Sequence, residues 1–161
     1  IYYAHKNTGR PLVNTEGKFE KFRSNYIDER NEPLFPFGFG LSYTNFEYSN
    51  LKISSDKMNF NGKVTVSIEV TNTGNYDGKE TVQLYIKDVV GSVTRPVREL
   101  KGFQKISLKK GEKQTVTFEI SVEDLKFYNS DLKFVAEPGQ FEVFVGGNSN
   151  ADKMVNFNLI D

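Results

Sequence analysis

The sequence has no cysteine and no tryptophan, and its only histidine is His5. Without cysteine, the chain cannot form a disulfide framework, a thiol nucleophile or a cysteine-ligated zinc site. A serine or threonine nucleophile would need a histidine partner, and His5 stands in an irregular N-terminal stretch. We therefore expect His5 to be a surface or hydrogen-bonded residue, and we assign no catalytic, cofactor-binding or metal-binding residue.

The sequence also lacks an excess of charge, because 21 Lys and Arg residues balance 21 Asp and Glu residues. A neutral chain has no strong field to attract nucleic acid or an anionic membrane. No apolar run approaches the roughly 18 residues that a spanning helix needs, and no signal-peptide pattern is present. We expect no nucleic-acid partner and no membrane span. The start at Ile1 predicts a fragment of a longer polypeptide, and the lack of an Asn-x-Ser/Thr sequon favours a bacterial one.

From Thr44 onward, apolar and polar residues alternate in short runs, as in strands with one buried and one wet face. Turn-forming pairs separate the runs, for example Asn61-Gly62 and Lys110-Gly111. Seven or eight short strands at this spacing predict an all-β fold, an immunoglobulin- or fibronectin type III-like antiparallel β-sandwich over residues 44–161. The alternating apolar positions lie in Val64–Val70, Val82–Ile86, Val116–Ile120, Phe141–Val145 and Val155–Leu159.

Three local patterns refine this prediction. The apolar positions of Phe46–Ile53 change phase, which predicts a bulge near Ser49-Asn50. The sequence Ser121-Val-Glu-Asp124 resembles a capping box and predicts one short helical turn before Leu125. Pro96 cannot donate to a central ladder, so we expect an edge strand or a loop around it.

Residues 33–43, termed the lead-in segment, stand between the irregular stretch and the strand array. They read Pro-Leu-Phe-Pro-Phe-Gly-Phe-Gly-Leu-Ser-Tyr, so aromatic rings alternate with proline and glycine. In an extended chain, residues two apart share a side, which predicts three rings on one side of a stiff apolar strip. We expect these rings either to fold back onto the sandwich or to be covered by residues 1–32. The predicted domain-docking residues are Phe35, Phe37, Phe39, Leu41 and Tyr43.

Other patterns give no site. Paired carboxylates can hydrolyse glycosides, but those of Asp28–Glu32 read as a solvated charge run. Gly38-Phe-Gly40 and Gly146-Gly147 could suggest phosphate loops, but neither leads into a helix. Asn148–Asp152 could suggest calcium ligation, and we favour a polar hairpin loop.

Longer motifs stand in a fixed order along the chain. They are Pro36-Phe-Gly-Phe-Gly-Leu-Ser-Tyr-Thr-Asn-Phe46, Val70-Thr-Asn-Thr-Gly74, Gly78-Lys-Glu-Thr-Val-Gln-Leu-Tyr85, Arg95-Pro-Val-Arg-Glu-Leu-Lys-Gly-Phe103, Lys110-Gly-Glu112 and Pro138-Gly-Gln-Phe-Glu-Val-Phe-Val-Gly-Gly147. In this order they resemble the C-terminal fibronectin type III-like domain of glycoside hydrolase family 3 β-glucosidases. Upstream, Tyr2–Pro11 resembles the exit from the α/β-sandwich domain that precedes it in that family.

The resemblance implies a division of the chain and a role. Residues 1–43 would be a linker from the preceding α/β-sandwich domain, and residues 44–161 the sandwich domain. The family's nucleophilic Asp and its acid/base Glu lie on other domains, so this chain would be a non-catalytic accessory domain that stabilises or docks on them. The parent enzyme would hydrolyse terminal β-D-glucosyl residues by a retaining mechanism, in the periplasm or outside the cell.

Two alternatives to docking remain open at this point. A carbohydrate- or surface-binding module could tether the enzyme to β-glucan or another oligosaccharide, and a homodimer could form on an edge strand. Exposed aromatic rings often build sugar-binding faces, although each ring alone is more often partial core. The candidate rings are Tyr76, Tyr85, Phe127, Tyr128 and Phe144.

Overall fold

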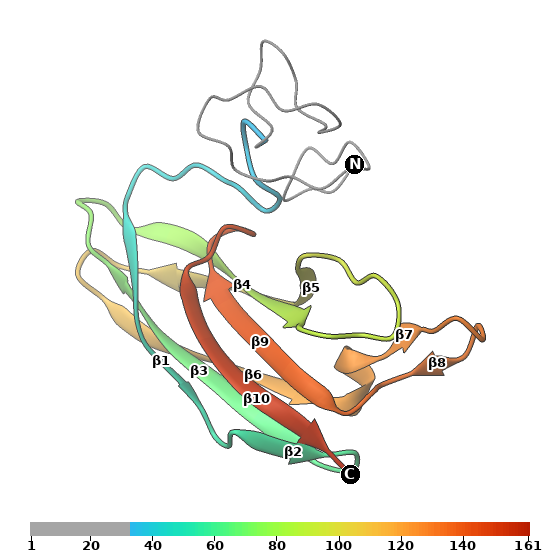
Figure 1. Cartoon of the computed structure of the whole chain (residues 1–161). Helices are drawn as coiled ribbons and strands as arrows, with labels where there is room; N and C mark the ends of the chain where they lie inside the picture. Colours follow the sequence, from blue (N-terminus) through green and yellow to red (C-terminus); the bar gives the residue numbers. More distant parts are fainter. Residues whose placement is uncertain (1–32) are drawn as a thin grey trace, which may run out of the picture.

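The computed structural model describes residues 33–161, which form a sandwich of two sheets (Figure 1). Within these residues, seven strands have eight or more residues, and the all-β sandwich prediction is confirmed. The N-terminal motif Tyr2–Pro11, His5 and the carboxylates of Asp28–Glu32 lie outside the described residues. The long strands are β1 (Phe46–Ile53), β3 (Lys63–Asn72), β4 (Gly78–Asp88), β5 (Glu99–Leu108), β6 (Lys113–Ser121), β9 (Gly139–Gly146) and β10 (Lys153–Ile160). The short ones are β2 (Lys57–Asn59), β7 (Phe127–Tyr128) and β8 (Phe134–Val135).

The strands form one sheet of three, one of five and a two-stranded hairpin. The smaller sheet has the order β1-β3-β6, and the larger has the order β2-β10-β9-β4-β5. Neighbouring strands are antiparallel, except that β2 runs parallel to β10. The β7–β8 hairpin stands out from one end of the sandwich (Figure 1). In the larger sheet β5 is an edge strand, and Pro96 lies in the loop before it, as the sequence predicts.

The core lies between the two sheets and is built from the alternating apolar positions. In β3, every second residue from Val64 to Val70 is fully buried, and its neighbours face water or are half-buried. Phe141 and Phe157 stack at the centre of the larger sheet with ring centroids 5.6 Å apart. Burial of apolar surface of this kind is the main force that holds two such sheets together.

Two local predictions are confirmed. The register of β1 against β3 shifts between Ser49 and Lys52, and Asn50 has a positive φ of 54°, so the bulge is where the phase change places it. A single 3-10 turn covers Val122–Leu125. The Asp124 carboxylate accepts hydrogen bonds from the Ser121 amide (2.8 Å) and hydroxyl (2.9 Å), so the third residue of the turn binds back to the N-cap as in a capping box.

Asn72, at the end of β3, connects three turns through one buried side chain. Its Nδ2 donates to the carbonyl oxygens of Tyr76 (2.8 Å) and Leu108 (3.1 Å). Its Oδ1 accepts from the Thr44 hydroxyl (2.7 Å) and the Gly74 amide (3.1 Å). Because Asn72 has no exposed surface, these four hydrogen bonds replace all the water that the amide would otherwise bind.

Strand β4 departs from the predicted alternation. Five consecutive residues from Val82 to Ile86 are buried, although the period-2 pattern predicts Gln83 and Tyr85 on a wet face. The reason is that segments distant in the sequence cover the outer face of β4. Those segments are the lead-in segment and the β9–β10 loop at residues 147–152, and together they make the site described next.

Candidate docking site

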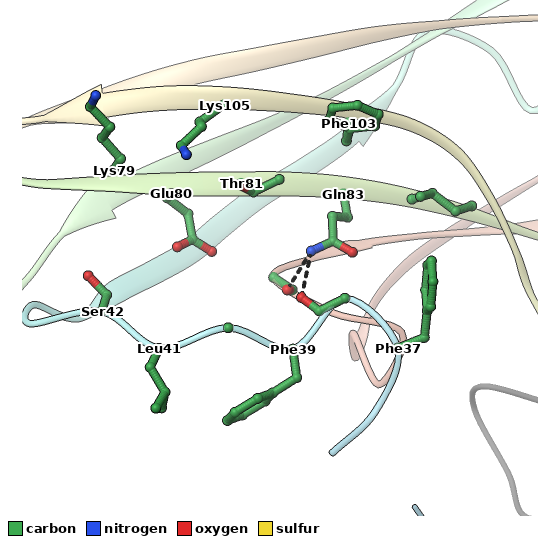
Figure 2. A pocket seen from close by; sticks show the side chains of 14 residues that line it. Phe37, Phe39, Leu41, Ser42, Lys79, Glu80, Thr81, Gln83, Phe103 and Lys105 are labelled. Carbon is green, nitrogen blue, oxygen red and sulfur yellow. Dashed lines mark hydrogen bonds between the residues drawn. The ribbon is translucent and has the colours of Figure 1, made fainter.

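The lead-in segment is a turn and not an extended strip. The amide of Phe39 donates to the carbonyl of Pro36 (3.1 Å), and Gly38 has a φ of +79°, which a β-turn of this kind requires at its third residue. The turn reverses the chain, so the prediction of three rings on one side is wrong. The rings of Phe35 and Phe39 pair at 5.0 Å, whereas Phe37 packs edge-on against Tyr85 at 6.5 Å. Figure 2 shows Phe37 and Phe39 pointing in opposite directions.

Gln83 holds this turn onto the larger sheet. Its Nε2 donates to the carbonyl oxygens of Gly38 (3.0 Å) and Gly147 (2.7 Å), drawn as dashed lines in Figure 2. Its Oε1 accepts from the hydroxyl of Tyr85. A Cβ at Gly38 would lie 2.0 Å from this same Oε1, so glycine is needed at that position. We term these contacts the Gln83 network.

Further contacts complete the cover over β4. The Ser149 amide donates to the Phe37 carbonyl (2.8 Å), which ties the β9–β10 loop to the lead-in segment. The guanidinium of Arg98 lies 3.6 Å above the Phe144 ring and donates to the carbonyls of Ser149 (2.7 Å) and Ala151 (2.8 Å). A guanidinium over an aromatic face is attractive, and bonds to two carbonyls fix its plane. The loop over residues 148–152 is thus a polar hairpin loop, as favoured from the sequence.

Three of the five candidate sugar-stacking rings are not exposed. Tyr85 and Phe144 lie under the Gln83 network and Arg98, and burial raises the pKa of Tyr85 to about 12. Phe127 is covered by the guanidinium of Arg95, 4.1 Å from the ring centroid. These three rings are therefore part of the core, the reading favoured from the sequence, and cannot form a sugar-stacking surface. Tyr76 and Tyr128 are each 66% exposed, as expected.

The predicted docking residues divide into one that folds back and four that do not. Phe37 lies against Tyr85. Phe35 is 62% exposed, Phe39 42%, Leu41 91% and Tyr43 98%. We term these four residues the apolar face; Phe35, Phe39 and Leu41 also line a shallow apolar hollow. Of the two expected alternatives for the rings, folding back onto the sandwich is met by Phe37 and not by Phe35 or Phe39. Cover by residues 1–32 lies outside the described residues.

A groove separates the lead-in segment from strands β4 and β5 (Figure 2). Its volume is about 490 Å3. One wall is the lead-in segment from Phe37 to Ser42. The floor and the far wall are formed by Lys79, Glu80, Thr81, Gln83, Leu100, Phe103, Lys105 and Gly147. Phe37, Phe39 and Leu41 of this groove are predicted docking residues, whereas the sequence does not single out the residues of β4 and β5 as part of a site.

Glu80 is the carboxylate among the residues that line the groove. Its Oε1 accepts a 2.6 Å hydrogen bond from the Tyr48 hydroxyl. Burial raises the pKa of Glu80 above its usual value, and the bond from Tyr48 opposes part of this increase. Burial, followed by the hydrogen bond to Glu80, also raises the pKa of Tyr48, so the phenol stays protonated and remains the donor.

We expect the substitution Glu80→Gln to change the pH dependence of stability. Because the folded-state pKa of Glu80 is raised, its favourable contribution is complete below the unfolded pKa of about 4.3 and is lost as the pH rises through the folded value. The variant should therefore gain stability relative to the wild type as the pH rises from about 4 to about 7. Urea unfolding at a series of pH values measures this difference.

Glu69→Gln serves as the control for this prediction. Hydrogen bonds from Asn50 and Lys113 lower the pKa of Glu69, so its contribution is present above the unfolded pKa and is lost as the pH falls through the folded value. The difference between variant and wild type should therefore change with pH in the opposite direction. The same pH trend in both variants would contradict the assignment of the raised pKa to Glu80.

Comparison with known proteins supports the sandwich fold. The family model of the fibronectin type III-like domain matches residues 80–149. A periplasmic β-glucosidase of Salmonella typhimurium is 52% identical over 160 residues, which is 99% of this chain and 21% of that protein. A β-xylosidase of Formosa agariphila is 50% identical over 127 residues, covering 79% of this chain and 18% of that protein.

A solved structure also has this fold. The crystal structure of a β-glucosidase from Listeria innocua in complex with glucose superposes with a TM-score of 0.85 at 42% identity. The match covers 100% of this chain and 22% of that one. The chain thus spans about a fifth of the length of the proteins that it matches.

Within residues 33–161, no helix is long and apolar enough to cross a bilayer. The chain therefore carries the fibronectin type III-like domain of the glycoside hydrolase family 3 enzymes.

Proposed function

We propose that this chain is the accessory domain of a β-glucosidase, and that it docks on the catalytic domains of its own polypeptide through the apolar face and stabilises them. Residues 1–43 act as the linker from the preceding α/β-sandwich domain. The parent enzyme hydrolyses terminal β-D-glucosyl residues with retention, and, like the Salmonella relative, it works in the periplasm. The supporting observation is a rigidly held segment that leaves Phe35, Leu41 and Tyr43 more than 60% exposed.

Docking explains why the large apolar side chains of the apolar face are exposed to water in this chain. Burying a large apolar side chain completely contributes roughly 1.5–3 kcal/mol, so three or four such residues contribute several times that amount. Contiguous exposed apolar patches on soluble domains usually mark interaction sites. The Gln83 network fixes the turn next to this face, so little conformational freedom is lost when a partner covers it.

The domain itself is not the site of hydrolysis. A retaining glycosidase needs two carboxyl groups about 5–5.5 Å apart on either side of the scissile bond. Glu80 is the one carboxylate among the residues that line the groove, and it is bonded to Tyr48. One engaged carboxylate cannot serve as both nucleophile and acid, which supports an accessory role.

The test compares the chain with its parent. The triple substitution of Phe35, Leu41 and Tyr43 by serine should leave the Tm of the 161-residue chain nearly unchanged, because within residues 33–161 these side chains are largely exposed. The same substitutions should lower the Tm of the parent enzyme by several degrees, since they remove buried contacts between domains. Differential scanning calorimetry of both proteins measures the two shifts. An unchanged Tm of the parent would refute docking through this face.

One observation favours tethering as a second function. The rings of Tyr128 and Phe134 pair at 5.0 Å on the β7–β8 hairpin and are 66% and 50% exposed. Paired exposed rings can stack on the apolar faces of pyranose units. Retardation of the chain, and not of a Tyr128→Ala variant, during electrophoresis through soluble β-glucan would support carbohydrate binding.

A further inference from the structure

The outer face of the β4–β5 ladder carries an ordered series of side chains. The antiparallel register places Lys79 opposite Ser107, Thr81 opposite Lys105 and Gln83 opposite Phe103. Directly opposite residues share a face of the sheet. The floor of the groove is therefore cationic at one end, with two lysines, and aromatic at the other.

The aromatic end is exposed although it belongs to a regular strand. Phe103 is 67% exposed in the middle of β5, and Leu100 is 36% exposed on the same edge strand. Edge strands of soluble proteins are usually protected by charges or by a covering segment. A large exposed ring on the floor of a groove is instead typical of a surface that a partner covers.

The cationic end has no partner within the chain. Neither Lys79 nor Lys105 forms an ion pair within residues 33–161. Some lysines elsewhere on the two sheets are paired, for example Lys87 with Glu142 and Lys113 with Glu69, each at 3.0 Å. The carboxylate that lines the groove, Glu80, is bonded to Tyr48. Two cations without an ion pair, next to the exposed ring of Phe103, are complemented by carboxylates on a partner.

We infer that the docking surface continues from the apolar face across the groove onto β5, and that the partner presents an apolar side chain to Phe103 and carboxylates to Lys79 and Lys105. The inference rests on the proposed function, because the occupant is the part of the parent polypeptide outside this chain. That part is large, since the chain spans about a fifth of its relatives' length. The lead-in segment is itself one wall of the groove, so the two surfaces are continuous.

The absence of cysteine from the chain allows a direct test. Thr81→Cys places a thiol in the groove and leaves both lysines in place. Thr115→Cys, on β6 of the other sheet, is the matched control. The rate of labelling by a thiol reagent is measured at each position, in the 161-residue chain and in the parent enzyme, by mass spectrometry of the labelled peptide.

We expect Thr81→Cys to react at least about tenfold more slowly in the parent than in the chain alone, with Thr115→Cys unchanged. Adding Lys79→Glu and Lys105→Glu to the parent should restore most of the lost reactivity, because like charges then face each other. Equal rates at Thr81→Cys in both proteins would overturn the inference, and so would equal slowing at both positions. Reactivity that is unaffected by the glutamate substitutions would overturn the assignment of carboxylates to the partner.

The two proposals can fail separately. If the serine substitutions in the apolar face lower the Tm of the parent while Thr81→Cys stays fully reactive, docking through the apolar face is supported and its extension onto β5 is refuted. If neither the lower Tm nor the slower labelling is seen in the parent, both proposals are refuted.

Discussion

The substitution Asn72→Asp is expected to lower the free energy of unfolding by about 3–5 kcal/mol, the largest effect of any single change considered in this chain. The variant has nearly the same shape, but both Nδ2 donors are lost. The carbonyls of Tyr76 and Leu108, at 2.8 and 3.1 Å, would then face a carboxylate oxygen in a site without exposed surface. Burying an unpaired charge against two acceptors is strongly unfavourable. Urea unfolding of the chain followed by circular dichroism measures the loss.

Asn75→Asp is the control for this prediction, since Asn75 lies in the turn that follows β3 but is exposed. Its Oδ1 accepts a 3.2 Å hydrogen bond from Lys110, which a carboxylate can also accept. The free energy of unfolding of this variant should change by less than about 0.5 kcal/mol. Similar losses in the two variants would show that the Asn72 amide does not hold the three turns together.

Gln83→Leu is expected to release the lead-in segment from the sheet and to lower the free energy of unfolding by about 2–4 kcal/mol. Leucine fills a similar volume, but the carbonyls of Gly38 and Gly147 lose the Gln83 donor, and the Tyr85 hydroxyl keeps only its long 3.5 Å bond to the Phe37 carbonyl. With the turn detached, its backbone becomes accessible to proteases. Limited digestion with chymotrypsin should then cleave within residues 35–43 much faster than in the wild type, while the sandwich stays intact.

Gln104→Leu provides the comparison. Gln104 also donates through Nε2 to a backbone carbonyl, that of Thr117 at 2.6 Å, but the contact is exposed and joins β5 to β6, not to the lead-in segment. Its loss should leave the cleavage rate within residues 35–43 unchanged. Equal cleavage of the wild type and Gln83→Leu would contradict a holding role for the Gln83 network.

The elements that depend on local periodicity could be predicted from the sequence. The alternation of β3 and β6, the bulge at Asn50 and the capping box at Ser121 all follow from residues within a few positions of one another. Backbone pleating, bulge geometry and helix capping are local, so the residues that cause them stand close together in the sequence.

The candidate site could be predicted only in part, because its contacts join segments far apart in the chain. Gln83 is 45 residues from Gly38 and 64 from Gly147, and no local pattern reveals that their carbonyls meet its amide. One signal was available for the turn. A glycine two residues after Pro36 is typical of a turn with positive φ at its third position, and this outweighs the period-2 reading of the rings.

The Gln83 network has a mechanical consequence. Strand β1, which follows the lead-in segment, is an edge strand of the smaller sheet, whereas Gln83 belongs to the interior of the larger one. A pull from the N-terminal side therefore does not simply peel β1 away from its neighbour, one hydrogen bond at a time. It first loads the amide of Gln83 and the Ser149 amide, and so the tension is shared between both sheets and the β9–β10 hairpin. The connection between the sandwich and the residues before it therefore resists shear before any strand has to separate.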